Sequence, residues 1–489
     1  MILFLPWIPL AGALVILAVS KEKRSVLSNI AIACCSVSFA ISVYYFFVYD
    51  TGLGGYQFVK RFPWIPSLGV EYVVGLDGIN LTFCLLHALV SLAGVFVAVQ
   101  TKDRLKEYLF YYLILTGAIY GVFSCLDLFF LYIFYETTLI PLFPMIGIWG
   151  SKNKSYGAMK LTLFITAGAM LALFALIVFY QRAGLSTFNL ILIQDHFAQG
   201  SPFSERFQTL LAPFLLLGFG VIASLWPLHS WSPIGYAAAP TSVSMLHAGV
   251  LKKMGPYLMI RIAIAFLPAG VAQWSGVLAV LAGIGIIYAG LAAIWQKDLK
   301  FMVGFSSVSH MGYVLLALAA LNTVSVSGAV LLMFSHGVMA ACMFALIGYL
   351  YERTHVRDIS DFGGLAQQTP FVSMCFIMAS LASLGLPGFS NFASELLVFL
   401  GSWNRFPILV CLAVVGILIT AVYLLRAVQK VCYGEPNPRW PHLKDAQGFK
   451  EKFPFVLLLG ALLLFGFWPN GLLNVIRPAV SSILAQGGF

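Results

Sequence analysis

The chain has 489 residues, of which 61% are hydrophobic and 9% charged, and its formal net charge is +10 at pH 7. Its apolar runs repeatedly exceed the roughly 18 residues that span a bilayer, which excludes a soluble globular domain and indicates a polytopic helical membrane protein. The basic residues lie in short loops between these runs. This is the pattern that sets membrane orientation, and it gives no sign of nucleic-acid binding.

Hydropathy predicts an all-α fold of about fourteen membrane-spanning helices. Lys and Arg collect in the loops that follow odd-numbered spans, so these loops are predicted to be cytoplasmic and both termini to lie outside. The predicted spans cover residues 2–19, 25–48, 78–100, 107–125, 127–149, 159–181, 209–226, 240–265, 272–295, 299–320, 325–350, 370–402, 407–427 and 453–469.

Two regions of the predicted bundle contain helix breaks. Pro227, Pro233 and Pro240 each remove a backbone donor, so the freed carbonyl groups must face protein or water. Glycine and proline at 385–388 interrupt a second span, five spans later. This spacing indicates an inverted internal repeat, which in transporters typically places ion sites near the midplane. The predicted divisions are a three-helix region at 1–106, five-helix repeats at 107–265 and 266–427, and a cytoplasmic connection, last helix and tail at 428–489.

Ionisable side chains within apolar sequence are the candidate functional residues, because a charged group at membrane depth costs roughly 2.5–3.5 kcal/mol on insertion scales. Histidine titrates near neutral pH, so a row of His, Lys and Glu can pass protons between waters. A single buried histidine is as often a packing residue, and a histidine at a break can cap a helix end. The candidates are Glu136, His229, His247, Lys252, Lys253, His310, His336 and Glu395.

Taken together, six segments resemble the antiporter-like membrane subunits of respiratory complex I, most closely the M-type chain of the NADH dehydrogenase subunit 4 family. The similarity runs roughly from Gly75 to the last predicted span. The matching segments are FYETTLIPLFPMIGIWG at 134–150, AAAPTSVSMLHAGVLKKMGPY at 237–257, FSSVSHMGYVLLAL at 305–318, FSHGVMAACMF at 334–344, LYERTHVRDISDFGGL at 350–365 and LPGFSNFASELLVFLGSW at 386–403.

The resemblance implies a role for each matching residue. Glu136 is similar to the family's glutamate of span five, Lys253 to the central lysine of span eight, and Glu395 to the terminal glutamate of span twelve. His310 and His336 match connecting histidines. Protons are therefore expected to pass along a buried Glu-Lys-His-Glu axis.

The chain departs from the family pattern in span seven. The family usually has a lysine there that pairs with the glutamate of span five, but this sequence has Ile222 at that point. Lys252 is the nearest extra cation and a possible substitute. Lys252 and Lys253 are about 100° apart around a helix, so they are expected to point in different directions. His247 resembles the L-type and cation-antiporter relatives.

Function, partners and location follow from the resemblance as expectations. The chain is expected to translocate protons as a membrane subunit of an NADH:quinone oxidoreductase-type complex, with no redox centre of its own. Its cysteines show no CxxC spacing, so no metal or cofactor is expected in this chain. Quinone, FMN and iron–sulfur clusters are expected in partner subunits. The expected partners are L-type and N-type antiporter-like chains, in a bacterial or archaeal cytoplasmic membrane.

Other functions stay open at this point. A subunit of a multi-chain sodium/proton antiporter would share the fold and the Lys–Glu axis. A structural spacer of the membrane arm that has lost transport is favoured by Ile222. An independent solute carrier is a third alternative, although the sequence contains no recognisable substrate pocket. The electron donor of the complex, and the choice of proton or sodium as the coupling ion, are left undecided.

Overall fold

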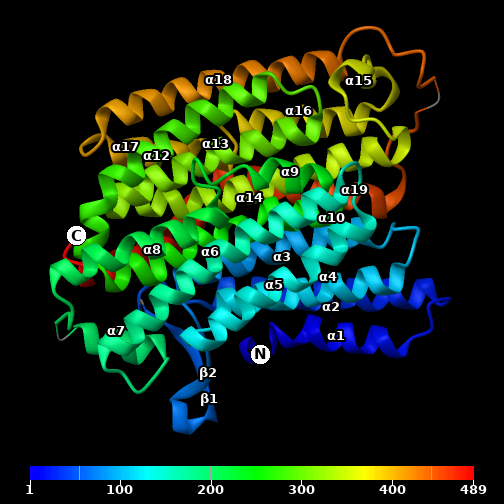
Figure 1. Cartoon of the computed structure of the whole chain (residues 1–489). Helices are drawn as coiled ribbons and strands as arrows, with labels where there is room; N and C mark the ends of the chain where they lie inside the picture. The colour runs from blue at the N-terminus through cyan, green and yellow to red at the C-terminus, as the bar shows by residue number, and fades with distance from the viewer. Residues whose placement is uncertain (54, 199, 442) are drawn as a thin grey trace.

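The computed structural model describes residues 1–489 apart from residues 54, 199 and 442. Most of these residues are helical, and the long helices lie side by side in one bundle (Figure 1). The helices of the first half are α1 (Trp7–Ala18), α2 (Arg24–Val48), α3 (Gly78–Ala98), α4 (Leu105–Ser124), α5 (Leu128–Trp149), α6 (Lys154–Ala183), α7 (Leu190–Ala198), α8 (Glu205–Ala223), α9 (Trp231–Ala238), α10 (Thr241–Gly249) and α11 (Met254–Leu258).

The second half has nine helices in its described part. They are α12 (Pro268–Ile294), α13 (Leu299–Ala320), α14 (Thr323–Thr354), α15 (Leu365–Gln368), α16 (Pro370–Ser383), α17 (Ser390–Trp403), α18 (Pro407–Cys432), α19 (Gly448–Phe467) and α20 (Asn470–Gln486). A 3₁₀ turn at Leu251–Lys253 joins α10 to α11, and a π-helical turn at Met259–Ile264 follows α11.

Nine single helices within the described residues are long and apolar enough to cross a membrane, and ten do so if α19 and α20, bent by 73°, count as one span. Part of the difference from fourteen arises because the breaks divide predicted spans. The span at 240–265 contains α10 and α11, and the span at 370–402 contains the short helices α16 and α17. The count of fourteen and the inverted repeat stay predictions.

The all-α expectation needs one correction, because a two-stranded antiparallel hairpin precedes α3. Strand β1 (Gln57–Ile65) pairs with β2 (Val70–Leu76). The turn between them ends at Gly69, whose φ of +68° is one that glycine adopts without strain. Strand β2 contains three valines and one tyrosine, residues that favour strands, and it is mostly buried. Hydropathy alone assigned this stretch to a loop because it is too short to span a bilayer.

The two ends of the bundle differ. The hairpin, α7 and the C-terminus lie toward one end, which we call the hairpin end (Figure 1). The opposite end carries α15 and the connection between α18 and α19, and we call it the connection end. The central helix α14 is almost wholly enclosed by its neighbours, as are α3 and α13, whereas α1 with α2 and α18 lie along opposite edges of the bundle (Figure 1). His310 on α13 and His336 on α14 therefore lie on enclosed helices, whereas Glu395 is a buried residue on α17, a helix with one exposed face.

Candidate functional site

The first predicted break is present, and protein groups satisfy its free carbonyls. Helix α9 ends one residue before Ala239, and Pro240 has no N–H to continue the hydrogen bonding. The Lys300 Nζ donates to the Ala239 carbonyl at 2.8 Å. The Arg357 guanidinium donates to the Ala237 carbonyl at 2.6 Å. Both cations lie at the negative end of the α9 dipole, so they stabilise a helix end that would otherwise expose carbonyl groups.

Lys252 and Lys253 lie in the 3₁₀ turn between α10 and α11, and both side chains are fully buried. They point to different neighbours, as their helical spacing predicted. Lys253 Nζ lies 3.0 Å from Nδ1 of His336 on α14. Lys252 Nζ donates to the hydroxyls of Ser232 on α9 and Ser307 on α13, at 3.2 and 3.3 Å. Among the described residues, neither lysine has a carboxylate within ion-pair distance.

A row of buried ionisable groups continues from Lys253 into the second half of the chain. The rings of His336 and His310 have their centroids 5.1 Å apart. The Nε2 of His310 lies 3.9 Å from the Oε1 of Glu395. The structure therefore brings four of the predicted residues, on four separate segments, into one continuous row.

His310 is held between two backbone carbonyls. Its Nδ1 lies 2.8 Å from the Ser306 oxygen, and its Nε2 lies 3.1 Å from the Ser383 oxygen. A carbonyl oxygen can only accept, so each contact is a hydrogen bond only when that ring nitrogen carries a proton. Both bonds together require the positively charged imidazolium. A negatively charged Glu395 carboxylate at this distance stabilises that charge. This position suits a group that gains and loses a proton.

The second predicted break holds Glu395 beside unwound backbone. Helix α16 ends at 383 and α17 begins at 390, with positive φ values of +68° at Gly385 and +101° at Gly388. A Cβ atom at Gly385 would overlap the Glu395 carboxyl group. Glycine at this position therefore serves two purposes, because it permits the left-handed backbone and leaves room for the carboxyl.

Glu136 is separate from this row. Its carboxylate accepts a hydrogen bond from the Tyr132 hydroxyl at 2.6 Å, and it is only partly buried within the chain. No ion pair to Glu136 occurs among the residues that the structure describes. Ile222 is buried, and Lys252 donates toward α9 and α13 without pairing with Glu136. The direct substitution of Lys252 for the missing lysine is therefore not formed in this structure.

The two remaining predicted histidines lie near Lys252. His247 is buried, with ring centroids 5.3 Å from Trp231 and 5.2 Å from Tyr236. Neither ring nitrogen of His247 has a hydrogen-bond partner in the described part of the chain. Lys252 Nζ lies 5.5 Å from the centroid of the same Tyr236 ring. His229 is buried in the turn before α9, against the ring of Tyr288.

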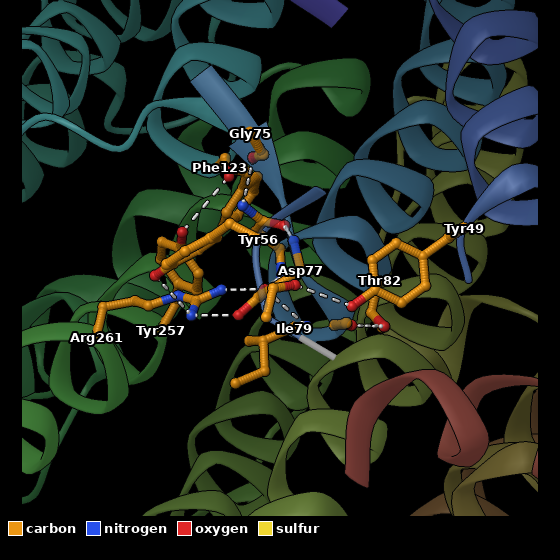
Figure 2. A network of polar contacts seen from close by, with 12 residues as sticks. Tyr49, Tyr56, Gly75, Asp77, Ile79, Thr82, Phe123, Tyr257 and Arg261 are labelled. Atoms are coloured by element: carbon orange, nitrogen blue, oxygen red, sulfur yellow. Dashed lines mark hydrogen bonds and ion pairs between the residues drawn. The ribbon is translucent and has the colours of Figure 1, made fainter. Parts of the chain in front are cut away.

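One buried ion pair was missed from the sequence. The guanidinium of Arg261, in the π-helical turn, donates to both carboxylate oxygens of Asp77, which precedes α3 (Figure 2). The rings of Tyr56 and Tyr257 lie 5.5 and 5.3 Å from the guanidinium carbon. The available signal was an arginine inside the predicted span 240–265, since a buried arginine needs an anion. Asp77 escaped notice because it lies one residue before a predicted span.

Comparisons with known proteins identify the family. The family model described as NADH:quinone oxidoreductase/Mrp antiporter, TM, matches residues 125–420. Subunit M of NADH-quinone oxidoreductase from Rickettsia felis is 33% identical over 490 residues, which cover 99% of this chain and 98% of the relative. The chain belongs to the NADH:quinone oxidoreductase/Mrp antiporter membrane family. The predicted resemblance to the M-type chains of complex I is thus confirmed.

Two solved structures share the fold. A chain of respiratory complex I from Thermus thermophilus, with bound NADH, superposes with a TM-score of 0.91 and 28% identity, covering 100% of both chains. A chain of the Mrp complex from Dietzia superposes with a TM-score of 0.86, covering 99% of this chain and 97% of that one. At 19% identity the second likeness concerns the fold alone. Within the described residues, no cluster of His, Cys, Asp and Glu could hold a metal ion.

Proposed function

We propose that this family member is a proton-translocating, antiporter-like subunit of a complex I-type quinone oxidoreductase. The observation that carries the proposal is the buried row from Lys253 through His336 and His310 to Glu395. Its groups are ionisable, enclosed and close enough for each charge to influence the next. The extensive similarity to subunit M chains supports the same function.

Electrostatic coupling along the row supplies a mechanism. At an effective dielectric constant near 20, unit charges 4 Å apart interact by roughly 4 kcal/mol, which is about 3 pKa units. The His310–Glu395 separation of 3.9 Å falls at this distance. Loss or gain of a proton by one group of the row therefore changes the proton affinity of the next group. In this proposal Lys253 is the loading site, the two histidines relay the proton, and Glu395 delivers it.

The other four predicted residues lie outside the row and precede Lys253 in the sequence. Lys252 and His247 share the Tyr236 ring, and His229 lies at the break that leads to them. We assign them to proton supply toward Lys253. The negative charge of Glu136 changes the proton affinity of Lys253. Glu136 gains a cationic partner when the protonation of the row changes. The two breaks also support the division into repeats at 107–265 and 266–427, flanked by the regions 1–106 and 428–489.

The proposed setting is the membrane arm of a larger complex. Quinone, FMN and iron–sulfur clusters belong to partner subunits and supply the electron transfer that drives the row. Neighbouring L-type and N-type antiporter-like chains are the proposed contacts within a bacterial or archaeal cytoplasmic membrane. Basic residues at the connection end, such as Arg24, Lys106 and Arg357, favour a cytoplasmic location for that end. Both termini would then lie outside.

Substitutions at the two ends of the row test this function. Lys253→Ala and Glu395→Gln are expected to cut proton pumping strongly in the purified complex reconstituted into liposomes. Glu395→Asp keeps the charge and is expected to retain part of the activity. Pumping is measured by quenching of a pH-sensitive dye, with electron transfer and assembly measured in parallel. Parental pumping by assembled Lys253→Ala or Glu395→Gln complexes would contradict the proposal.

A structural spacer is the second candidate, and a specific observation favours it. The lysine expected in span seven is replaced by buried Ile222, and Glu136 has no cation within ion-pair distance in the described chain. A spacer would tolerate Lys253→Ala without any change in the number of protons pumped per electron pair. Identification of the subunits that co-purify with the chain separates a complex I-type assembly from a multi-chain sodium/proton antiporter.

A further inference from the structure

The Asp77–Arg261 pair ties the segment that carries Lys253 to the start of α3. The side chain of Arg261 is 1% exposed and the side chain of Asp77 is 5% exposed. Asp77 also accepts hydrogen bonds from the N–H groups of Ile79 and Asn80, each at 3.0 Å, and so caps α3. The carboxylate is thus held by a guanidinium and by a helix N-terminus at once. Tyr56 lies in the segment that follows α2, and its hydroxyl accepts a hydrogen bond from the same guanidinium at 3.3 Å.

Three aromatic rings pack next to this pair. Phe83 and Phe123 are stacked with centroids 5.2 Å apart. Tyr257 meets their rings edge-on at 5.4 and 5.2 Å, and all three side chains are fully buried. We call Phe83, Phe123 and Tyr257 the aromatic layer. The one side-chain polar group of these three residues, the Tyr257 hydroxyl, donates to the Phe123 carbonyl at 3.4 Å, so the rings in mutual contact offer little polar surface to hold a chain of water molecules.

The order of contacts places this layer between Lys253 and the hairpin end. Helix α3 runs antiparallel to the segment from α10 to the π-helical turn. Gly249 packs against Val90, the Tyr257 ring meets Phe83, and Arg261 meets Asp77 at the start of α3. Lys253 lies between the first two contacts in sequence. Arg261 lies eight positions after Lys253, which corresponds to a rise of about 12 Å along a helix.

We propose that the Asp77–Arg261 pair and the aromatic layer form a seal that blocks proton passage from Lys253 to the hairpin end. The aromatic layer excludes the water that would carry protons. The Asp77–Arg261 pair holds this layer in place, because it ties the segment that carries Tyr257 to the helix that carries Phe83. A proton on Lys253 then has the His336 side as its way out, instead of a direct path along its own broken helix.

Passive proton leak tests the seal without turnover. The purified complex is reconstituted into liposomes, no electron donor is added, and the decay of an imposed pH difference is followed with an enclosed dye. Arg261→Gln is expected to raise the leak several-fold. The matched control is Arg353→Gln, which breaks a half-buried Arg353–Glu451 pair of 2.9 Å at the connection end and should leave the leak unchanged. A complex with Arg261→Gln that is as tight as the parent would overturn the seal.

Two further variants cover a failure of Arg261→Gln to assemble. The double variant Asp77→Asn/Arg261→Gln leaves no unpaired charge in the buried site, which favours folding. Phe83→Ala opens the aromatic layer and keeps the ion pair. Both are expected to leak, and parental tightness in both would overturn the proposal. Lys253→Ala should stay tight even though it is expected to stop pumping, so failure of the seal and failure of the proposed function give different results.

Discussion

Gly385 and Gly388 provide a matched pair of alanine substitutions in the break beside Glu395. Both glycines have positive φ values, +68° and +101°, so each alanine introduces backbone strain of roughly 1–2 kcal/mol or more. The two sites differ in what the new Cβ meets. At Gly385 it overlaps the Glu395 carboxyl group, whereas at Gly388 its nearest neighbour is the Phe467 ring at 3.6 Å. Comparison of the two variants therefore isolates displacement of the carboxyl.

The expected size of the effect follows from the geometry of the row. Restoring ordinary contact with a Cβ at Gly385 requires the carboxyl to move by on the order of 1 Å. The present His310–Glu395 separation is 3.9 Å. At an effective dielectric constant near 20, lengthening it by about 1 Å weakens the interaction by roughly 0.9 kcal/mol, or about fivefold in relative protonation. Gly385→Ala is therefore expected to pump several-fold more slowly than Gly388→Ala.

The assay is proton pumping by the reconstituted complex, normalised to its electron-transfer rate. Assembly of each variant is checked on native gels. The double variant Gly385→Ala/Glu395→Asp removes one methylene from the crowded side chain, and it is expected to recover part of the lost pumping. Equal pumping by the Gly385→Ala and Gly388→Ala complexes, both assembled, would refute the claim that the position of this carboxyl controls the row.

Two other predictions concern the first half of the chain. Glu136→Gln is expected to reduce pumping strongly and leave assembly intact, because the role proposed for Glu136 depends on its charge; parental proton stoichiometry in the assembled variant would count against this role. Lys252→Met is expected to assemble and to keep or raise the thermal midpoint of the complex, because it removes a buried cation whose described hydrogen-bond partners are the hydroxyls of Ser232 and Ser307. A clear drop in that midpoint would show that Lys252 mainly stabilises the fold.

Local features of the sequence predicted the general plan well. Apolar runs of spanning length indicated a helical membrane protein, and helices occupy each predicted range. Pro240 and the Gly385–Gly388 stretch marked the breaks, because a missing N–H or a positive φ disrupts a helix whatever surrounds it. The family motifs then pointed to Lys253, His310, His336 and Glu395. The hairpin before α3 lacked such a signal, since its strands are too short for a hydropathy window.

Composition, periodicity and breaks are local properties, so the sequence by itself determined the class of protein, its breaks and most of its ionisable residues at depth. Contacts between distant segments depend on how the helices pack, and only the tertiary structure decided them. It joined Lys253 to His336, and Asp77 to Arg261 across 184 positions of sequence. It also left Glu136 without a cation among the described residues. A charge within a span shows that a partner is needed, but packing chooses which partner lies within reach.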